Sequence, residues 1–429
     1  MRRFNVQRLP FEAPKAFALC LALIITAWFL AQSWRGLTVF FTGDDIMNIY
    51  WSCEASWTRL LTANLTPFTT EYRPLGALLY RALFETFGLN PLPFRLLFYS
   101  LMLANTFLCF QLARLLTRST EVALLAALMA SFHNRFLDLY LNNGTIYDVL
   151  CATFYLAALC LYISVRRDGN ALTLPQWTLL LILEIAALNS KEIAATLPAM
   201  LIAYELLLNK RPIRYFGLAT SLAIAAVAAW ARFQPGSRLL HNDGYALHLT
   251  LHQYLNTSRK FLENLFYLNE SSLTTTKTAI FLLGLLLLAF LTRSLALRFC
   301  LLFVLIAPLP VNFIVERELY AAYLTVLGWA ILLSVILVGT RDWMYAHLWS
   351  RQTAEGTFEP ERFFLALTVA AVLFTAKSKD RPIPWANAQC PNNQVCAFRD
   401  QMQSLVPAPG SILLLSVPVI GWLAVFKPF

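Results

Sequence analysis

Long apolar runs separated by short polar segments dominate the pattern of residues along this chain. A helix that crosses a membrane needs about 20 consecutive, mostly apolar residues, and by that criterion the chain has about eleven spans. They are predicted at residues 16–34, 93–116, 119–134, 145–165, 174–189, 191–208, 214–232, 277–292, 296–314, 319–339 and 361–377. We therefore predict an all-α polytopic membrane protein.

Two long segments between the predicted spans have helical patterns of their own. In the first, residues 35–92, apolar side chains recur every three to four residues over 46–61. That period indicates an amphipathic helix lying on the membrane interface. A second helix is predicted from Pro74, a residue favoured in first turns, to about Phe87. The second long segment, residues 233–276, has a helical pattern near its middle.

Composition supports a membrane protein and narrows its partners. Of the 429 residues, 58% are hydrophobic and 14% are charged, whereas soluble domains contain about 25% charged residues. A net charge of +10 is compatible with nucleic-acid binding. However, the basic residues form no patch in the sequence, and they follow the ends of predicted spans instead. The lipid bilayer is therefore the predicted partner, and nucleic acid is not.

Basic residues also predict how the chain crosses the membrane, because short cytoplasmic loops carry an excess of Lys and Arg. With a cytoplasmic N-terminus, every short inside segment contains two or more of them. These residues are Arg2, Arg3, Arg8, Lys15, Arg114, Arg118, Arg166, Arg167, Lys210, Arg211, Arg214, Arg293, Arg298, Arg341, Arg351 and Arg362. We expect a cytoplasmic N-terminus, an uncleaved first span, and both long segments on the extracytoplasmic side.

The last part of the chain, residues 378–429, differs in character from the predicted transmembrane module at 1–377. It begins with a polar linker and contains an apolar run over 411–426. That run is either a twelfth span or part of a small extracytoplasmic domain. We favour the domain, because the run is short and Pro418 and Gly421 interrupt it.

Two of the eight cysteines lie in a polar segment of this last part, and the others lie mainly in apolar runs. Cys390 and Cys396 would face an oxidising compartment if the segment is extracytoplasmic, and a local disulfide between them is then expected. Zinc binding is not predicted. His248 and His252 would share a helix face, but no set of His and Cys residues has the spacing of zinc ligands.

An acidic pair, Asp44-Asp45, follows the first predicted span. One structural interpretation is an N-cap with a first-turn acid on the next helix. Only one Asp is needed for that role, and two adjacent carboxylates repel each other, which raises the pKa of one. A carboxylate tuned in this way suits general-base catalysis. Carboxylates close to the membrane are also costly unless they line a wet cavity or act in chemistry.

Basic residues in three other predicted extracytoplasmic segments are suited to binding phosphate. Arg73 offers a planar fork that matches phosphate oxygens, Lys191 offers a point charge, and Arg317 offers a second fork. The structural alternatives are an ordinary interface turn and charges at helix ends. We take the neighbours of these cations as supporting residues, namely Glu71, Tyr72, Glu192, Glu316 and Tyr320. Two polar groups from another extracytoplasmic segment, His133 and Asp148, are added to them.

Three segments resemble the GT-C glycosyltransferases. They are Tyr72-Arg73-Pro74-Leu75 with its continuation to Pro91, Ser190-Lys191-Glu192 with its continuation to Leu206, and Glu316-Arg317-Glu318-Leu319-Tyr320, which is similar to the Glu-Arg-x-x-Tyr element of that group. With the acidic pair, the motifs cover residues 35–340 in the same order. Within the superfamily the chain resembles the protein O-mannosyltransferases and the transmembrane-and-TPR mannosyltransferases, and most of all their bacterial relatives without TPR repeats.

This resemblance implies a GT-C fold, a polyprenyl-phosphate sugar as donor, and an acidic motif in the first extracytoplasmic loop, here Asp44-Asp45. It also implies a multi-pass protein of a bacterial inner membrane, with an extracytoplasmic active site that serves the cell envelope. The second acid is Asp where protein mannosyltransferases usually have Glu. The long second loop holds no folded insert, and there is no TPR array. The resemblance thus suggests the donor, whereas the acceptor stays open between protein and glycolipid.

The combined expectation is a glycosyltransferase that moves a sugar from a polyprenyl-phosphate donor to an acceptor hydroxyl. Either Asp44 or Asp45 would act as the base, and we favour Asp44, with Asp45 as its support. No cofactor is required, although a divalent metal (Mg or Mn) at Asp44 and Asp45 is compatible with this chemistry. The alternative is a transporter or flippase for a lipid-linked or small anionic substrate. Such proteins show paired internal repeats, which this sequence lacks.

The predicted orientation has a direct test. A membrane-impermeant thiol reagent applied to intact cells should label reduced Cys390 and Cys396, because the segment that carries them is expected outside. Labelling should be read by mass spectrometry after reduction. If these thiols react only after the membrane is permeabilised, the predicted orientation is wrong.

Overall fold

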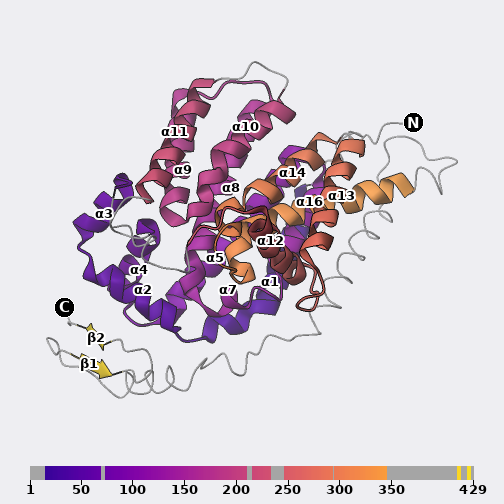
Figure 1. Ribbon diagram of the computed structural model, residues 1–429. Coiled ribbons are helices and arrows are strands. Elements are labelled where there is room, and N and C mark those ends of the chain that lie inside the picture. Colours follow the sequence, from indigo (N-terminus) through magenta and orange to yellow (C-terminus); the bar gives the residue numbers. More distant parts are fainter. Residues whose placement is uncertain are drawn as a thin grey trace.

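The computed structural model describes residues 15–68, 73–209, 215–232, 246–292 and 294–344, together with the strands at 413–416 and 423–426. Apart from these strands, the regular structure of the described residues is helical (Figure 1). The all-α architecture predicted for the membrane part is confirmed.

The elements follow one another along the chain with few long connections. In order they are α1 (Lys15–Ser33), η1 (Trp34–Thr38), α2 (Gly43–Glu54), α3 (Trp57–Leu65), α4 (Pro74–Phe87), α5 (Pro91–Thr117), α6 (Thr120–Ser131), α7 (Leu137–Leu141), η2 (Asn143–Thr145), α8 (Ile146–Arg167), α9 (Leu174–Ser190), η3 (Glu192–Thr196), α10 (Leu197–Leu207), α11 (Tyr215–Arg232), α12 (Leu251–Leu265), α13 (Thr275–Thr292), α14 (Leu295–Ile306), α15 (Leu309–Asn312), η5 (Leu319–Ala322), α16 (Tyr323–Met344), β1 (Leu413–Ser416) and β2 (Leu423–Phe426).

Seven helical segments in the described part of the chain are long and apolar enough to cross a membrane. They correspond to α1, α5, α8, α11, α13, the α14–α15 pair and α16 with its preceding turn. The apolar helices α6 and α9 are shorter. The chain is therefore a multi-pass integral membrane protein. The exact number of eleven spans is not confirmed, and the predicted span at 361–377 lies outside the described residues.

Two predicted spans are not single α-helices. The span predicted at 191–208 begins with the 3-10 turn η3 and continues as α10, which has Pro198 in its first turn. The span predicted at 296–314 is divided at Pro308 into α14 and α15. Both divisions occur at proline, whose ring excludes the backbone hydrogen bond of a continuing helix.

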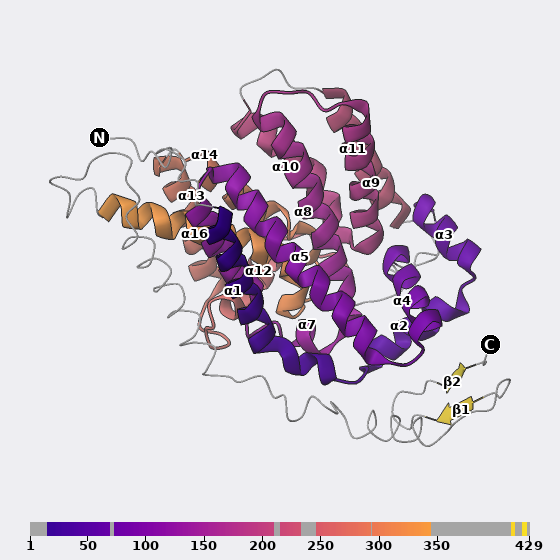
Figure 2. The ribbon, with the colours of Figure 1, turned by 180° about the vertical axis from the view of Figure 1, so that it is seen from behind.

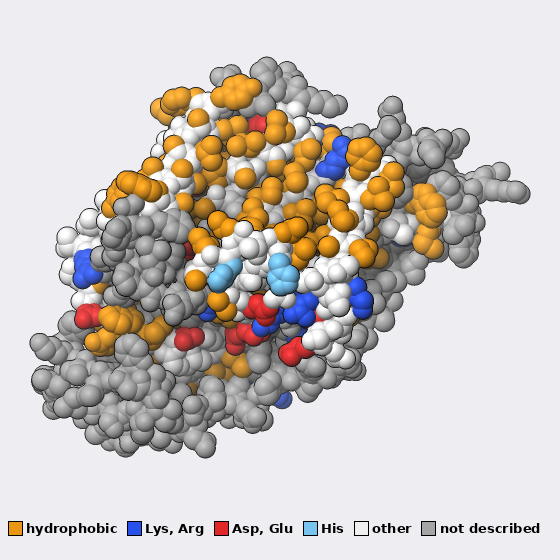
Figure 3. All heavy atoms as spheres, viewed as in Figure 1, with side chains coloured by type: hydrophobic (Ala, Val, Ile, Leu, Met, Phe, Trp, Pro, Cys, Tyr) orange, Lys and Arg blue, Asp and Glu red, His pale blue; other side chains and the backbone are white. Residues whose placement is uncertain are grey.

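The helices pack as layers around α5, α8 and α16. Helix α5 packs against α6 and α8, and α16 packs against α6, α14 and α8 (Figures 1 and 2). Within the membrane-spanning window, 83% of the residues of α16 are buried, compared with 17% for α13. Helix α16 is therefore central, whereas α13 lies at the surface of the bundle. Figure 3 shows the result on one face, where apolar side chains cover a wide area and charged side chains gather in a narrower band.

The first long loop folds into three helices that lie together beside α5 and α9 (Figures 1 and 2). The single amphipathic helix predicted over 46–61 is instead two helices, α2 and α3. The break falls at Ala55, which is extended, and Ser56 caps α3 by accepting from the amide of Arg59. The side chain of Ser56 accepts a backbone hydrogen bond in the first turn of α3, so the chain can start a second helix here instead of continuing α2. Helix α4 begins at Pro74 and ends at Phe87 as predicted.

Helix α4 holds α2 at both ends. The hydroxyl of Tyr80 donates to Asp45 Oδ1 in the first turn of α2 (3.0 Å). The neighbouring Arg81 donates through Nη1 to the carbonyl of Cys53 near its last turn (2.5 Å). The last carbonyls of a helix have no intrahelical donor, so Arg81 satisfies a group that would otherwise need water. This clamp sets the position of α2 on the bundle.

Two later predictions concern the second long loop and the last part of the chain. The helical pattern in the second loop is confirmed as α12. In the apolar run at 411–426, β1 and β2 pair antiparallel, with Leu413 opposite Phe426. The other residues of this run lie outside the described residues, so the choice between a span and an extracytoplasmic domain stays open. Cys390 and Cys396 also lie outside them, and the disulfide stays a prediction.

Candidate active site

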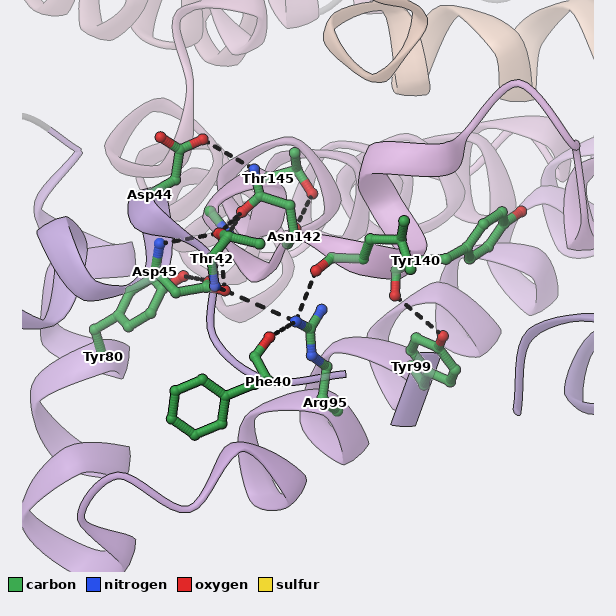
Figure 4. A network of polar contacts seen from close by, with 12 residues as sticks. Phe40, Thr42, Asp44, Asp45, Tyr80, Arg95, Tyr99, Tyr140, Asn142 and Thr145 are labelled. Atoms are coloured by element: carbon green, nitrogen blue, oxygen red, sulfur yellow. Dashed lines mark hydrogen bonds and ion pairs between the residues drawn. The ribbon is translucent and has the colours of Figure 1, made fainter. Parts of the chain in front are cut away.

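The two acids of the predicted pair have different environments. Asp45 is fully buried and forms a capping box with Thr42, whose amide donates to Asp45 Oδ2 (2.8 Å). Tyr80 donates to the other oxygen, and Arg95 Nη2 lies 3.8 Å from Oδ2 (Figure 4). Burial raises the pKa of Asp45, and the charge of Arg95 and these hydrogen bonds oppose the rise. Asp45 therefore has the capping role that the structural interpretation assigned to one of the two acids.

Arg95 joins three segments beneath α2. It projects from the first turns of α5 and is fully buried. Its Nη2 donates to the carbonyls of Phe40 (2.9 Å) and Leu141 (2.7 Å) as well as facing Asp45 (Figure 4). Phe40 follows the first span and Leu141 ends α7, so one guanidinium fixes both loops next to the start of α2. A buried charge of this kind is tolerated because it is paired and hydrogen-bonded.

Asp44, in contrast, is exposed. Asn142 donates from Nδ2 to Asp44 Oδ2 (2.9 Å), while its own Oδ1 accepts from the Thr42 hydroxyl (2.8 Å) and from the Gly144 amide (2.8 Å). A Cβ on Gly144 would lie 2.7 Å from the Cβ of Asp44, so this close approach requires glycine. Asn142 thus holds the exposed carboxylate in one orientation. Among the described residues, none is seen to donate a hydrogen bond to Oδ1.

All three predicted phosphate-binding residues line one pocket of about 350 Å³. Arg73, Lys191 and Arg317 enter it from the start of α4, the end of α9 and the segment before η5, and Arg232 enters from the end of α11. Glu192 and Tyr320 also line it. The remaining lining residues are apolar, namely Leu188, Ala195, Ala228, Ala229, Leu247, Leu249, Leu309, Pro310, Val311, Phe313, Ile314 and Ala321. The pocket therefore combines a cationic cluster with apolar walls.

The polar side chains around this pocket pair differently from the sequence-based expectation. The sequence predicts Glu192 as a supporting residue beside Lys191. Instead, Lys191 Nζ forms a buried ion pair with Asp148 of α8, and the ammonium lies 5.8 Å from the ring centroid of Tyr320. Glu192 pairs with Arg73 (3.1 Å) and with Arg232 (3.4 Å). Asp148 is thereby explained as the counter-ion of Lys191, which makes its burial in an apolar helix tolerable.

A chain of contacts connects the pocket with α2. The guanidinium of Arg73 lies 5.3 Å from the ring centroid of Tyr147, and the hydroxyl of Tyr147 donates to Asn48 Oδ1 (3.0 Å). Asn48 is four residues after Asp44 and therefore shares its helix face. Arg73 itself has a left-handed backbone, with φ of 55°, which is an uncommon conformation for a non-glycine residue and is typical of functional sites.

Asp138 of α7 is within electrostatic reach of both Asp44 and Glu318. Burial raises the pKa of Asp138, and the negative charges of Glu318 and Asp44 raise it further. The charges of Asp44 and Glu318 therefore both act on Asp138. The acid on α2 and the cations of the pocket belong to one region of the molecule.

His133 has a structural role in the described chain. Its Nε2 contacts the carbonyl of Leu265 (3.1 Å), and its Nδ1 accepts from the Arg135 amide (3.2 Å), so Nε2 must carry the hydrogen. The ring stacks on Tyr267 with centroids 4.5 Å apart. Burial lowers the pKa of His133 to about 4. The neutral ring joins the α6–α7 connection to the end of α12.

Two more of the predicted supporting residues, Glu316 and Tyr320, lie at or near the pocket. Glu316 accepts from Asn256 Nδ2 and lies 3.7 Å from Lys260 Nζ, so it connects the Arg317 segment with α12. Tyr320 lines the pocket. Glu71 and Tyr72 lie outside the described residues.

Sequence reasoning missed Arg95, Asn142, Asp138 and Arg232. Arg95 and Arg232 each had a signal, because a basic residue inside or at the outer end of an apolar run is costly and often functional. Asn142 had none, since an Asn in a loop is common and only the fold places it against Asp44.

A metal site at the acidic pair is not supported by the geometry. Asp45 is buried in its capping box, so its oxygens do not face the same space as those of Asp44. Within the described ranges, no three His, Cys, Asp or Glu side chains gather where a metal ion could bind. Metal dependence stays a prediction.

The arrangement of helices has a counterpart among solved structures. The chain has a GT-C-like fold. No protein-family model and no curated protein matches the chain. Among solved structures, the archaeal oligosaccharyltransferase AglB from Archaeoglobus fulgidus, in complex with an inhibitory peptide and a dolichol-phosphate, is similar with a TM-score of 0.52. The match has 13% identity and covers 92% of this chain, which spans 58% of the length of that chain.

The different environments of the two acids lead to a stability prediction. We expect Asp45→Asn to lower the free energy of unfolding by about 3 kcal/mol, because it leaves the buried charge of Arg95 without its counter-ion. Asp44→Asn should change it by less than about 0.5 kcal/mol, because that side chain is exposed. Thermal unfolding of the purified proteins in one detergent, followed by tryptophan fluorescence, compares them. Equal losses in both variants would contradict the assignment.

Proposed function

We propose that the protein is a membrane glycosyltransferase that moves a sugar from a polyprenyl-phosphate donor to an acceptor hydroxyl on the extracytoplasmic face. The observation that carries the proposal is the pocket described above. It places Arg73, Lys191 and Arg317 among apolar walls. Contacts through Tyr147 and Asn48 connect it with α2, the helix that carries the exposed carboxylate of Asp44.

The pocket suits the two parts of such a donor. Guanidinium and ammonium groups bind phosphate oxygens through charge-assisted hydrogen bonds. The apolar lining from α11 and α15 suits an isoprenoid chain, which gains free energy when it leaves water. A small soluble anion would not contact the apolar lining. A lipid without phosphate would not bind the cations.

Asp44 is the proposed general base. Its Oδ1 accepts the proton of the acceptor hydroxyl, and the hydroxyl oxygen forms a bond to the anomeric carbon of the sugar. The bond from that carbon to the phosphate oxygen breaks at the same time, and its electron pair stays on the phosphate. Because a single displacement attacks from the opposite face, the configuration at the anomeric carbon is inverted. Asn142 keeps Asp44 Oδ2 occupied and so orients Oδ1.

The cations act on the leaving group. The donor phosphate is a diester with one negative charge, whereas the released monoester carries between one and two charges at neutral pH. Charge therefore develops on the phosphate during the reaction. Fixed cations aimed at developing charge lower the barrier more than they stabilise the bound donor. Arg73, Lys191 and Arg317 have this role in the proposal.

The similar solved structure supports the donor class in one respect. AglB, which has the same fold, binds a dolichol-phosphate and a peptide. A lipid phosphate is therefore accommodated by at least one protein of this architecture. From the sequence, the proposal further takes the acceptor as a protein or a glycolipid. It takes the membrane as a bacterial inner membrane, with the N-terminus in the cytoplasm.

A transfer assay tests the proposal. Full-length protein in lipid nanodiscs should transfer labelled sugar from one member of a polyprenyl-phosphate sugar panel to hydroxyl-bearing peptides or glycolipids. Asp44→Asn should lower kcat at least about 100-fold, because general-base catalysis contributes that much or more. The KM for the donor should change little, since Asp44 does not line the donor pocket.

Glu54→Gln is the matched control, because Glu54 is an exposed acid at the other end of α2. It should retain the wild-type rate. Full turnover in Asp44→Asn would reject Asp44 as the base. Movement of intact donor across the bilayer, without sugar transfer to any acceptor, would favour a flippase instead.

A further inference from the structure

The pocket contains an anion of its own. The carboxylate of Glu192 lines it together with four cationic side chains. Oε2 lies 3.1 Å from Arg73 Nη2, and Oε1 lies 3.4 Å from Arg232 Nη1. Each carboxylate oxygen therefore contacts a different guanidinium, and Glu192 bridges two arginines that are far apart in the sequence.

The two arginines are positioned independently of Glu192. Arg73 is held by its left-handed backbone before Pro74 and by the ring of Tyr147. Arg232 also donates from Nη2 to the carbonyl of Leu188 (3.3 Å). Glu192 begins η3 directly after the extended residue Lys191. Three separate elements thus converge on one point, and Glu192 is the side chain placed between the two guanidinium groups.

A carboxylate in this position has the same bonding requirements as a phosphate. Both anions present oxygens to guanidinium groups through charge-assisted hydrogen bonds. A phosphate that entered the pocket would meet Arg73 and Arg232 already engaged by Glu192. Two anions within a few ångströms repel each other, and this repulsion is strong where the walls are apolar.

Counting charges shows which carboxylate opposes the phosphate. Arg73, Lys191, Arg232 and Arg317 line the pocket, and Glu192 is the acid among the lining residues. Asp148, which neutralises Lys191, is buried in α8 and does not line the pocket. Glu192 is therefore the charge that an incoming anion faces directly.

We propose that Glu192 is an internal competitor for the donor phosphate, which it must release from the fork formed by Arg73 and Arg232. Arg232 is then a fourth phosphate-binding residue. The proposal rests on the function proposed above, because it takes a lipid phosphate as the ligand. It explains how a strongly cationic pocket releases its product: Glu192 returns to the two arginines as the charged monoester leaves.

Direct binding tests the proposal without any transfer reaction. Titration calorimetry on the full-length protein in detergent would use three probes, namely a prenyl monophosphate, the matching prenyl alcohol and inorganic phosphate. Glu192→Gln should bind the prenyl monophosphate roughly tenfold more tightly than the wild type, because the competing charge is removed and the side chain keeps its size. Arg232→Gln should bind it more weakly. The alcohol should respond to neither change.

Glu270→Gln is the charge-matched control. Glu270 is an exposed acid after α12, outside the pocket, so its removal should leave the affinity unchanged. If Glu192→Gln does not fold, Glu192→Asp keeps the charge but is too short to bridge both arginines. It should also bind the prenyl monophosphate more tightly than the wild type.

The possible outcomes separate the two proposals. Weaker or unchanged binding in folded Glu192 variants would show that Glu192 only scaffolds the arginines, and would overturn the competition. If Glu192→Gln also binds inorganic phosphate more tightly, by the same factor, the pocket recognises the phosphate group itself, which supports the proposal. A wild-type protein that binds neither the lipid phosphate nor inorganic phosphate would overturn this proposal and the donor class together.

Discussion

The guanidinium of Arg95 is the contact on which the arrangement of the candidate site depends. It binds the carbonyls of Phe40 and Leu141 and faces the carboxylate of Asp45, all from a fully buried position. Because an unpaired buried charge costs several kcal/mol, these three segments must stay together in the folded protein. The start of α2 is then fixed, and Asp44, the next residue toward the N-terminus, is directed outward to Asn142 (Figure 4).

The two adjacent acids therefore have separate roles, one structural and one proposed as chemical. Asp45 completes the helix cap and neutralises Arg95, and Asp44 remains exposed on the same helical turn. The clamp by Tyr80 and Arg81 adds rigidity at both ends of α2. A base must be held within hydrogen-bonding reach of its substrate. A short helix capped and clamped in this way provides that precision better than a mobile loop would.

Much of the fold followed from the sequence, because apolar length and helix-start residues are local properties. Most of the predicted spans have a helical counterpart, and Pro74 starts α4 as expected. The cationic pocket was predicted from residue type, since Arg73, Lys191 and Arg317 do line one cavity. Which acid pairs with which cation was not predictable from the sequence. Glu192 meets Arg73 across 119 residues of chain, and the partner of Lys191 is Asp148, because only the packing of helices decides which charges meet.

The central claim is that one pocket, lined by α11, α15 and four cations, receives the phosphate end of a polyprenyl lipid. Photoaffinity labelling tests it most directly. A prenyl phosphate with a diazirine in its first isoprene unit would be irradiated with the full-length protein in nanodiscs, and the adducts mapped by mass spectrometry. We predict adducts on α11 and on residues 309–314, abolished by excess unlabelled prenyl phosphate but not by prenyl alcohol. Adducts confined to other helices, or labelling that the phosphate does not compete away, would contradict the account.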